Sequence, residues 1–372
     1  MGISNKFDRV WQLVWKEFRQ IFRDPRLARL IFVAPIIQLV IFGYAVSTDI
    51  RNTPVFVVDH DPSRFSREVV EALTVSGFFK VVGRSDKPSD IVKALDYGDA
   101  MMGVEIPVDF TKRLEERSGA EIQLLFDGTN SNTAMVARSY AERIVQNYGN
   151  RFGVVERPLT IDLRERAWYN PSLVSRNYYV PAVVGIIILL VCLLLTSLAI
   201  VREREIGTLE QILVSPLTAG ELIAGKTIPF AIISLADMTL VTAVALLWFR
   251  IPFEGNFFNL FFASILYILP ALGIGLFIST ISNTQQEAFM TSFLFFQPAV
   301  LLSGFMFPVS SMPDFFRWLT LLNPVRHYLE IVRGIFLKGT GLLELWPQYT
   351  ILLIMGVATL WFSALRFKKK AV

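Results

Sequence analysis

Residues 220–227 (GELIAGKT) satisfy G-x-x-x-x-G-K-[S/T], the pattern of a loop that binds nucleotide phosphates through backbone N–H groups and a lysine. Such a loop needs a buried strand before it and a helix start after it. Here the stretch has a helical pattern and continues into an apolar segment, with Pro229 near its start. No apolar strand ending in Asp follows to hold magnesium. We therefore expect the match at Gly220–Thr227 to be accidental, and this chain to bind no cofactor itself.

A second candidate is the charged run Arg202–Glu205 that precedes this stretch. Leu209, Ile212 and Leu213 follow it and form a small apolar face. A short, charged amphipathic helix of this kind suits docking into a groove of a partner protein. The alternating charges are also typical of a solvated helix end with i,i+4 ion pairs. The residues leave both interpretations open.

Asp237 is the only acidic residue within a clearly apolar segment. Carboxylates inside a membrane are costly and are candidates for function by default. The alternative is a structural position, either near the interface or paired locally with Thr239 or Thr242. A role in proton relay predicts pH-sensitive transport that Asp237→Asn abolishes.

The remaining reactive side chains form no recognisable site. His60 and His327 are far apart in the sequence, and the Asp59 and Asp61 pair at a strand end fits turn chemistry as well as cation binding. Cys192 is the only cysteine, so neither an internal disulfide nor a cysteine zinc site can form. The sequence predicts no catalytic residue and no metal site.

The composition indicates a membrane protein. Apolar residues make up 53% of the 372 residues and charged residues only 18%, and a helix that crosses a bilayer needs about 20 predominantly apolar residues. Six segments qualify: 30–48, 177–201, 227–249, 255–286, 288–313 and 345–365. The sequence therefore predicts an all-α transmembrane domain of six helices.

Lys and Arg gather beside the spans in residues 6–29, 202–226 and 366–370, which share one side if six spans alternate. The positive-inside rule makes that side cytoplasmic. Both termini are then cytoplasmic and residues 49–176 are external. Because orientation explains the net charge of +4, we expect no nucleic-acid partner.

The amino-terminal residues 6–23 have the pattern of an amphipathic helix. Its polar face is predicted to carry Lys6, Arg9, Lys16, Glu17 and Arg19. Its apolar face is predicted to carry Phe7, Val10, Trp11, Val14, Trp15, Phe18, Ile21 and Phe22. A basic, Trp-bearing helix before a span is typical of the membrane interface. It is either a generic anchor or a lever that moves with the first span.

Residues 49–176 alternate between short apolar runs and amphipathic helices. The predicted strands are 54–59, 78–83, 100–106 and 122–127, with a long helix over 133–149. This alternation is typical of an α/β layer domain. The predicted fold is thus a six-helix membrane domain with an inserted extracytoplasmic α/β domain. In 308–343, two short helices are predicted to dip into the outer leaflet.

Four stretches resemble the ABC-2-type permeases, the membrane subunits of one class of ABC exporters. They are KEFRQIFRDPR near the amino terminus, IPVDF with FDGTNSNTA, REREIGTLEQILVSP followed by GK, and NPVRHYLEIVRGIFLKG. The likeness is to the larger, drug-efflux-like subgroup. It implies a cytoplasmic elbow helix (1–26), a first span (27–48), an external α/β domain (49–176) and spans 2–6 (177–372). Within the last part it implies a coupling loop (202–226) and external re-entrant helices (308–343).

The resemblance also implies partners and site residues. It implies a dimer with a second permease, itself or a paralogue, and two ABC ATPase subunits that hold ATP and Mg, with membrane lipids around the spans and room for a periplasmic adaptor protein. The implied coupling residues are Arg202, Glu203, Arg204, Glu205, Gly207, Thr208, Glu210 and Pro216. The candidates for the transport pathway are Asp237, Phe293, Phe296 and Gln297.

The expected function is that of a non-catalytic permease subunit in the bacterial inner membrane. An ATP-driven complex would export amphiphilic, drug- or lipid-like molecules, because permeases for polysaccharides in this superfamily generally lack a large external insert. Two alternatives are a sodium exporter and a mechanotransmitter that drives an external partner without moving a substrate.

Overall fold

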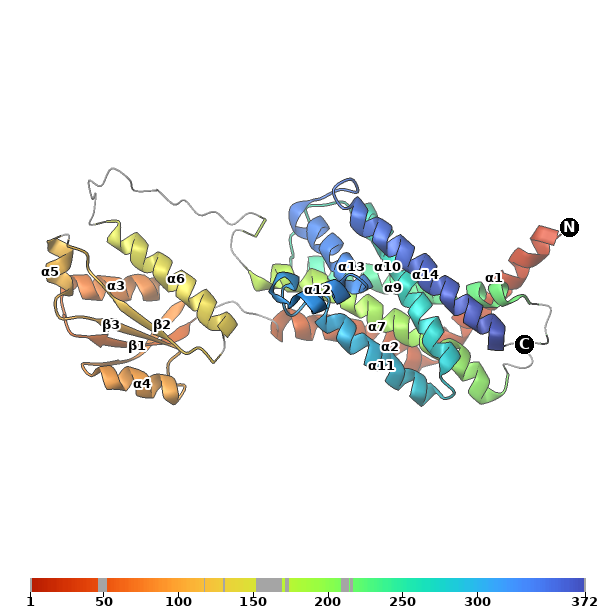
Figure 1. Ribbon diagram of the computed structural model, residues 1–372, viewed down its shortest axis with the longest axis horizontal. Helices are drawn as coiled ribbons and strands as arrows, with labels where there is room; N and C mark the ends of the chain where they lie inside the picture. The colour runs from red at the N-terminus through yellow and green to blue at the C-terminus, as the bar shows by residue number, and fades with distance from the viewer. Residues whose placement is uncertain are drawn as a thin grey trace. The chain divides into compact units, whose positions relative to one another are not determined.

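The computed structural model describes residues 2–45, 52–116, 118–129, 131–151, 169–170, 174–208, 214 and 217–370 (Figure 1). The chain divides into two compact units. Met1–Ser47 and Ala167–Val372 form a helical unit, and Thr48–Arg166 form an α/β unit. Each unit is described by itself below.

The helical unit is built from long apolar helices and a few short ones. Its elements are α1 (Gly2–Arg23), α2 (Pro25–Ala45), α7 (Ser175–Ile206), α9 (Ala219–Leu247), α10 (Phe257–Ile281), α11 (Gln285–Leu301), η1 (Val309–Ser311), α12 (Asp314–Thr320), α13 (Pro324–Arg333), η2 (Gly334–Lys338) and α14 (Trp346–Lys370). Among the described residues, α7, α9, α10 and α14 are long and apolar enough to cross a membrane. The apolar part of α2, Ile31–Tyr44, is shorter. These helices are compatible with a membrane-embedded all-α domain.

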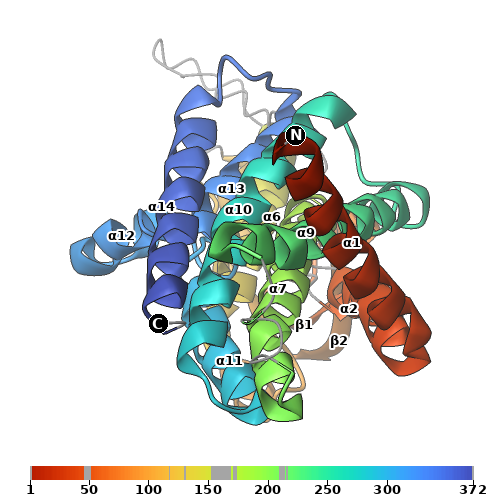
Figure 2. The ribbon, with the colours of Figure 1, turned by 90° about the vertical axis from the view of Figure 1, so that its right-hand side faces the viewer.

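Helix α7 lies among the others and packs against α2, α9, α10, α11 and α13 (Figure 2). It is apolar on every side, as expected of a helix buried at the centre of a bundle. On the α10 side, a Cβ at Gly275 would lie 2.8 Å from Thr196 Cβ and 3.1 Å from the Leu193 carbonyl oxygen. Ser279 Oγ accepts hydrogen bonds from the backbone N–H of Ile200 at 3.1 Å and Val201 at 3.3 Å. The backbones of α7 and α10 therefore approach closely where a small residue permits it.

The two short helices predicted in 308–343 correspond to α12 and α13, and they differ in burial. On α12, Phe315 and Trp318 are exposed, whereas α13 packs against α7, α10 and α14. The ring of Tyr328 on α13 stacks on Tyr267 with centroids 4.1 Å apart. Tyr267 in turn donates a hydrogen bond to the Gly185 carbonyl at 3.0 Å. Helix α13 is thus part of the bundle core.

The α/β unit contains a four-stranded sheet in the order β2-β1-β3-β4. Its elements are β1 (Thr53–Asp59), α3 (Arg64–Val75), β2 (Phe79–Ser85), α4 (Pro88–Asp96), β3 (Met102–Ile106), α5 (Phe110–Glu115), β4 (Gln123–Phe126) and α6 (Ser131–Gly149). Strand β1 is parallel to β2 and β3, and β4 is antiparallel to β3. The four strands form where the sequence pattern predicts them.

Polar contacts fix the loops of this unit. Asp59 accepts hydrogen bonds from Ser66 Oγ at 2.8 Å and from the Asp61 backbone N–H at 3.0 Å, while Asp61 accepts one from the Thr111 backbone N–H at 2.6 Å. Both carboxylates therefore accept hydrogen bonds from the loop after β1 and from the first turns of α3 and α5. On α6, burial raises the pKa of Tyr148 to about 12, and its hydroxyl donates to Glu68 at 3.1 Å.

Candidate functional site

The stretch GELIAGKT lies in the first turns of helix α9. Thr218 is the N-cap, and it forms a capping box with Glu221 in which each side chain accepts from the other residue's backbone N–H. The capping box marks a helix start, not a phosphate-binding loop. Arg9 on α1 lies 3.4 Å from Glu221, which brings the amino-terminal helix against this helix start.

Lys226 is buried and bonded to two carboxylates. Its Nζ donates to Glu17 Oε1 at 2.8 Å and to Glu203 Oε1 at 3.0 Å. A third bond goes to the Ala199 carbonyl at 3.3 Å. Lys226, Glu17 and Glu203 are only 4%, 5% and 6% exposed. Lys16, which is half exposed, completes this Lys226 cluster with a 2.8 Å bond to Glu203.

The cluster joins three elements that are distant in the sequence. Glu17 comes from α1, Glu203 from the last turn of α7, and Lys226 from the second turn of α9. Residues 203 and 226 therefore lie in the two helices that flank the segment between α7 and α9. Buried charges remain stable only when they are paired and hydrogen-bonded. The cluster consequently holds α1 and both flanking helices, α7 and α9, in one arrangement.

Gly225 explains how α1 comes so close. A Cβ at this position would lie 2.9 Å from both Cβ and Cγ of Leu13 on α1. Leu13 packs with Ile200 and Leu222 at the same place. Glycine at a helix crossing permits this approach. The G-K pair of the nucleotide-loop pattern is thus used here for a helix crossing and its ion pairs.

A second set of bonds ties the end of α7 to the turn between α10 and α11. The Arg204 guanidinium donates to the Ser282 carbonyl. Glu205 Oε1 accepts from the Gln285 backbone N–H at 2.8 Å, and Oε2 accepts from the Gln285 side-chain amide. Arg202 and Gln285 line a small cavity of about 100 Å³ together with residues of the Lys226 cluster.

Helix α7 ends at Gly207, whose φ of +79° is left-handed. A glycine in this conformation is a common helix stop. Thr208 closes the end, because its backbone N–H donates to the Glu203 carbonyl at 3.0 Å and its hydroxyl to the Glu203 carboxylate. Of the predicted coupling residues, 202–205 thus form a helix end, while Glu210 and Pro216 lie outside the described residues.

The pathway candidates occupy two different environments. Asp237 on α9 is fully buried, and within the described part of the chain neither of its oxygens has a hydrogen-bond partner. Thr239 and Thr242 bond to Leu235 and Met238 on the same helix, so neither pairs with Asp237. On α11, in contrast, Phe293 and Gln297 are exposed and Phe296 is half-buried.

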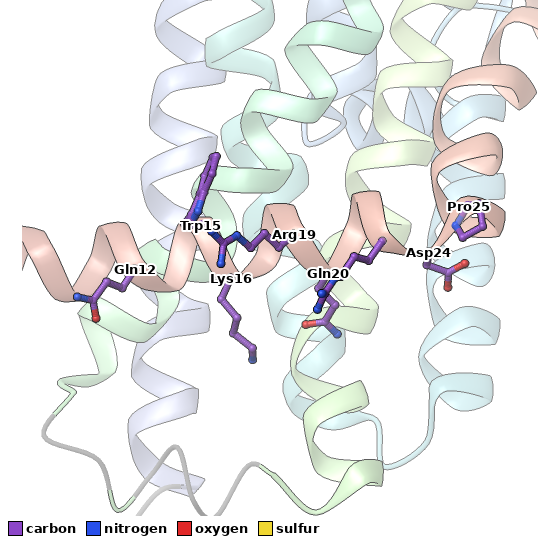
Figure 3. Close-up of a pocket in the computed structure, with 8 residues that line it drawn as sticks. Gln12, Trp15, Lys16, Arg19, Gln20, Asp24 and Pro25 are labelled. Atoms are coloured by element: carbon purple, nitrogen blue, oxygen red, sulfur yellow. The ribbon is translucent and has the colours of Figure 1, made fainter.

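Helix α1 has distinct faces, as Figure 3 shows for Trp15 and Lys16, which extend from opposite sides of the helix. The aromatic residues Trp11 and Trp15 are exposed. A shallow hollow of about 750 Å³ is lined by Trp15 together with Gln12, Lys16, Arg19 and Gln20, among others. Exposed tryptophan next to basic side chains is typical of a helix at a membrane interface.

The sequence pattern assigned Glu17 to the polar face of α1, and the structure instead buries it. Positions 14, 17 and 21 recur at helical spacing, so Glu17 shares the stripe of Val14 and Ile21. The signal was present as an acid within an apolar stripe, but its partner could not be recognised. Lys226 and Gln285 were likewise missed, because their partners lie far away in the sequence.

Replacing Gly220 with Ala is expected to leave transport unchanged. A Cβ at Gly220 meets no atom within 4 Å, and alanine favours a helix by up to about 1 kcal/mol over glycine. Thermal unfolding and transport of the variant measure both effects. A phosphate-binding loop predicts the opposite, loss of function at this glycine, and photolabelling of the isolated chain by an ATP analogue would contradict the helical interpretation.

Comparison with known proteins covers nearly the whole chain. The model of a family described as ABC-2 family transporter protein matches residues 29–365. "Probable multidrug ABC transporter permease YbhR" of Escherichia coli (strain K12) is 34% identical over 98% of this chain and all of the relative. "Probable multidrug ABC transporter permease YbhS" of the same organism is 33% identical over 96% of this chain and 94% of the relative. "Inner membrane transport permease YhhJ" is 26% identical over 97% of each.

Proposed function

This chain belongs to the ABC-2 family of transporter permeases, and from that premise we propose that it exports amphiphilic small molecules, drug- or lipid-like, in an ATP-driven complex. As a permease it is a membrane subunit that is not catalytic by itself and works with ABC ATPase subunits. The proposal takes the substrate class from the relatives whose names describe multidrug permeases. Two ATPase subunits would bind the ATP and Mg.

The Lys226 cluster carries the proposal. When the soluble ATPase subunits close on ATP, they can move membrane helices only through a contact that is stiff and specific. Residues 203 and 226 border the segment between α7 and α9, and both are bonded within the cluster. Arg204 and Glu205 extend these bonds to the start of α11. A displacement of this segment by the ATPase would therefore be transmitted to α1, α7, α9 and α11 together.

The proposed topology has six spans, formed by α2, α7, α9, α10, α11 and α14, in a bacterial inner membrane. Both termini and the segment between α7 and α9 would be cytoplasmic, as the distribution of Lys and Arg supports. The α/β unit would be extracytoplasmic. A second permease, identical or paralogous, would complete the pathway. The exposed Phe293 and Gln297 on α11 are the side chains we propose for that interface.

Reconstitution tests the proposal. The permease and its ATPase subunits in liposomes should move a fluorescent amphiphile across the bilayer when ATP is added, and should not do so with a non-hydrolysable analogue. A complex that hydrolyses ATP and moves an external partner without vectorial transport would be a mechanotransmitter. ATP-dependent sodium movement in place of amphiphile movement would assign the alternative ion substrate.

Changing Glu205 to Ala is expected to weaken coupling while leaving membrane insertion intact. The variant loses both bonds to Gln285 at the start of α11. Because Glu205 is exposed, we expect the transport per ATP hydrolysed to fall only roughly two- to fivefold, in line with the modest strength of exposed polar contacts. Glu254→Ala, a charge removal away from these contacts, is the control. Unchanged transport and unchanged substrate-stimulated hydrolysis in Glu205→Ala would count against the proposal.

A further inference from the structure

A hollow of about 490 Å³ lies between α10, α11 and α14, of which α10 packs against both of the others (Figure 2). Its walls include Ile274, Phe277 and Ile278 on α10, Leu294 and Phe295 on α11, and Phe362 on α14. Its volume is within the range of ligand pockets. Of the residues proposed for coupling or for the pathway, none that the structure describes lines it.

The side chains that line the hollow favour a hydrocarbon occupant. Two of the hydroxyl groups in the wall are already used, since Ser363 donates to the Gly273 carbonyl at 2.7 Å and Thr359 to the Met355 carbonyl at 2.9 Å. The other wall residues are apolar apart from Thr291. A polar group placed inside would therefore lose its hydrogen bonds to water with little compensation. An alkyl chain makes no hydrogen bonds to water and therefore loses none on entering.

The hollow lies toward the end of the bundle that carries the coupling contacts. Its wall extends along α10 to Ile281, next to Ser282, whose carbonyl accepts from Arg204. It is bordered by side chains that are open to the surroundings, because Leu294 is 75% and Phe362 66% exposed. In a membrane-embedded domain these side chains face lipid. The hollow is thus accessible from the leaflet on the coupling side.

A positive charge stands beside the hollow. The Arg366 guanidinium lies 5.5 Å from the centroid of the Phe277 ring, which is part of the wall. Arg366 follows Phe362 by one helical turn, and among the described residues no carboxylate lies within ion-pair distance of it. Lys368, Lys369 and Lys370 follow in the sequence. Basic residues at the end of a span attract anionic lipid head groups.

We propose that this hollow binds an acyl chain of an anionic phospholipid from the surrounding leaflet, with the lipid phosphate on Arg366. The apolar walls hold the chain and Arg366 selects the head group. The occupant is a lipid of the bilayer, because the hollow opens through exposed apolar side chains and offers a soluble ligand little hydrogen bonding beyond its rim. This site is separate from the proposed transport pathway and does not depend on the substrate.

Photolabelling tests the site in the full-length permease, reconstituted in phosphatidylcholine nanodiscs. Two probes carry a diazirine on the acyl chain, one with a phosphatidylglycerol head group and one with phosphatidylcholine. Peptides containing Phe277, Leu294 or Phe362 should be labelled by the anionic probe about fivefold more than by the zwitterionic one, the factor that one Arg supplies at an anionic surface. Equal labelling by the two probes would overturn the proposal.

Two variants separate the head-group contact from the chain contact. Arg366→Gln should remove the preference for the anionic probe and leave labelling by the zwitterionic probe unchanged. Leu294→Trp should fill the hollow and lower labelling by both probes, whereas Ile354→Trp, at another exposed position on α14 outside the hollow, should not. Unchanged labelling in Leu294→Trp would contradict the site. Labelling by a water-soluble alkyl phosphate probe but not by phosphatidylglycerol would assign it to a soluble amphiphile and overturn the lipid proposal.

Discussion

Lys226→Met is expected to lower the free energy of unfolding of the permease by about 3–5 kcal/mol, the usual effect of removing one partner from a buried ion pair. Methionine keeps much of the volume but removes the cation that is hydrogen-bonded to the buried Glu17 carboxylate, which then keeps the longer 3.7 Å contact with Lys16. Glu203 keeps its 2.8 Å bond to Lys16, so the more weakly paired Glu17 is the main source of the loss. Thermal unfolding of the purified protein in detergent measures the effect.

The double variant Glu17→Gln with Lys226→Met separates stability from coupling. It removes the weakly paired buried charge of Glu17, so the free energy of unfolding should recover most of the loss, because neutral replacements of buried ion pairs are often tolerated. The bond between Glu17 of α1 and Lys226 of α9 stays broken, and transport per ATP should therefore remain low. A single variant as stable as the wild type, or a double variant with full transport, would refute the proposed role of the cluster.

Much of the fold could be predicted because its signals are local. The alternation of apolar residues marks the strands of the α/β unit, and the long, predominantly apolar stretches mark α7, α9, α10 and α14. The helix stop at Gly207 also follows from a local rule. The boundaries of the helices were predicted less accurately. The segment taken as the coupling loop 202–226 is shorter in the structure, because α7 continues to Ile206 and α9 begins at Ala219.

Only part of the candidate site could be predicted from the sequence. The run Arg202–Glu205 could be singled out from its charges alone. Its partners could not, because Lys16 and Gln285 are 187 and 80 residues away from the side chains they bind. Glu17 was assigned to the polar face because hydropathy counts a carboxylate as a surface group. It takes a partner such as Lys226 to make the buried position stable.

The nucleotide-loop pattern illustrates how one set of residues can satisfy two physical demands. Glycine permits close approach of a phosphate, and it equally permits close approach of another helix. A lysine that would bind phosphate oxygens can bind carboxylate oxygens instead. Gly225 and Lys226 meet Leu13 and Glu17 of α1 in this way. Only the secondary structure around the pattern, which is the capped start of α9, distinguishes the two.

Gly275→Leu is the second substitution for which we expect a large effect. Its Cβ would lie 2.8 Å from Thr196 Cβ and 3.1 Å from the Leu193 carbonyl oxygen, and a helix backbone cannot move aside as a flexible side chain can. Overpacking of this kind costs about 1–3 kcal/mol of stability. Gly220→Leu adds the same side chain in open space and should change thermal unfolding far less.

The position of Gly275 links this packing to coupling. Directly beyond it, Ser279 binds the backbone of α7 at residues 200 and 201, one turn before the charged end that holds Lys226 and Gln285. Pushing α7 away from α10 should therefore also displace Glu203 and Glu205 from their partners. Gly275→Leu is expected to lower transport per ATP as well as stability, and Ser279→Ala to lower transport with a smaller loss of stability. Transport at the wild-type level in Gly275→Leu would mean that the seam between α7 and α10 does not transmit the motion.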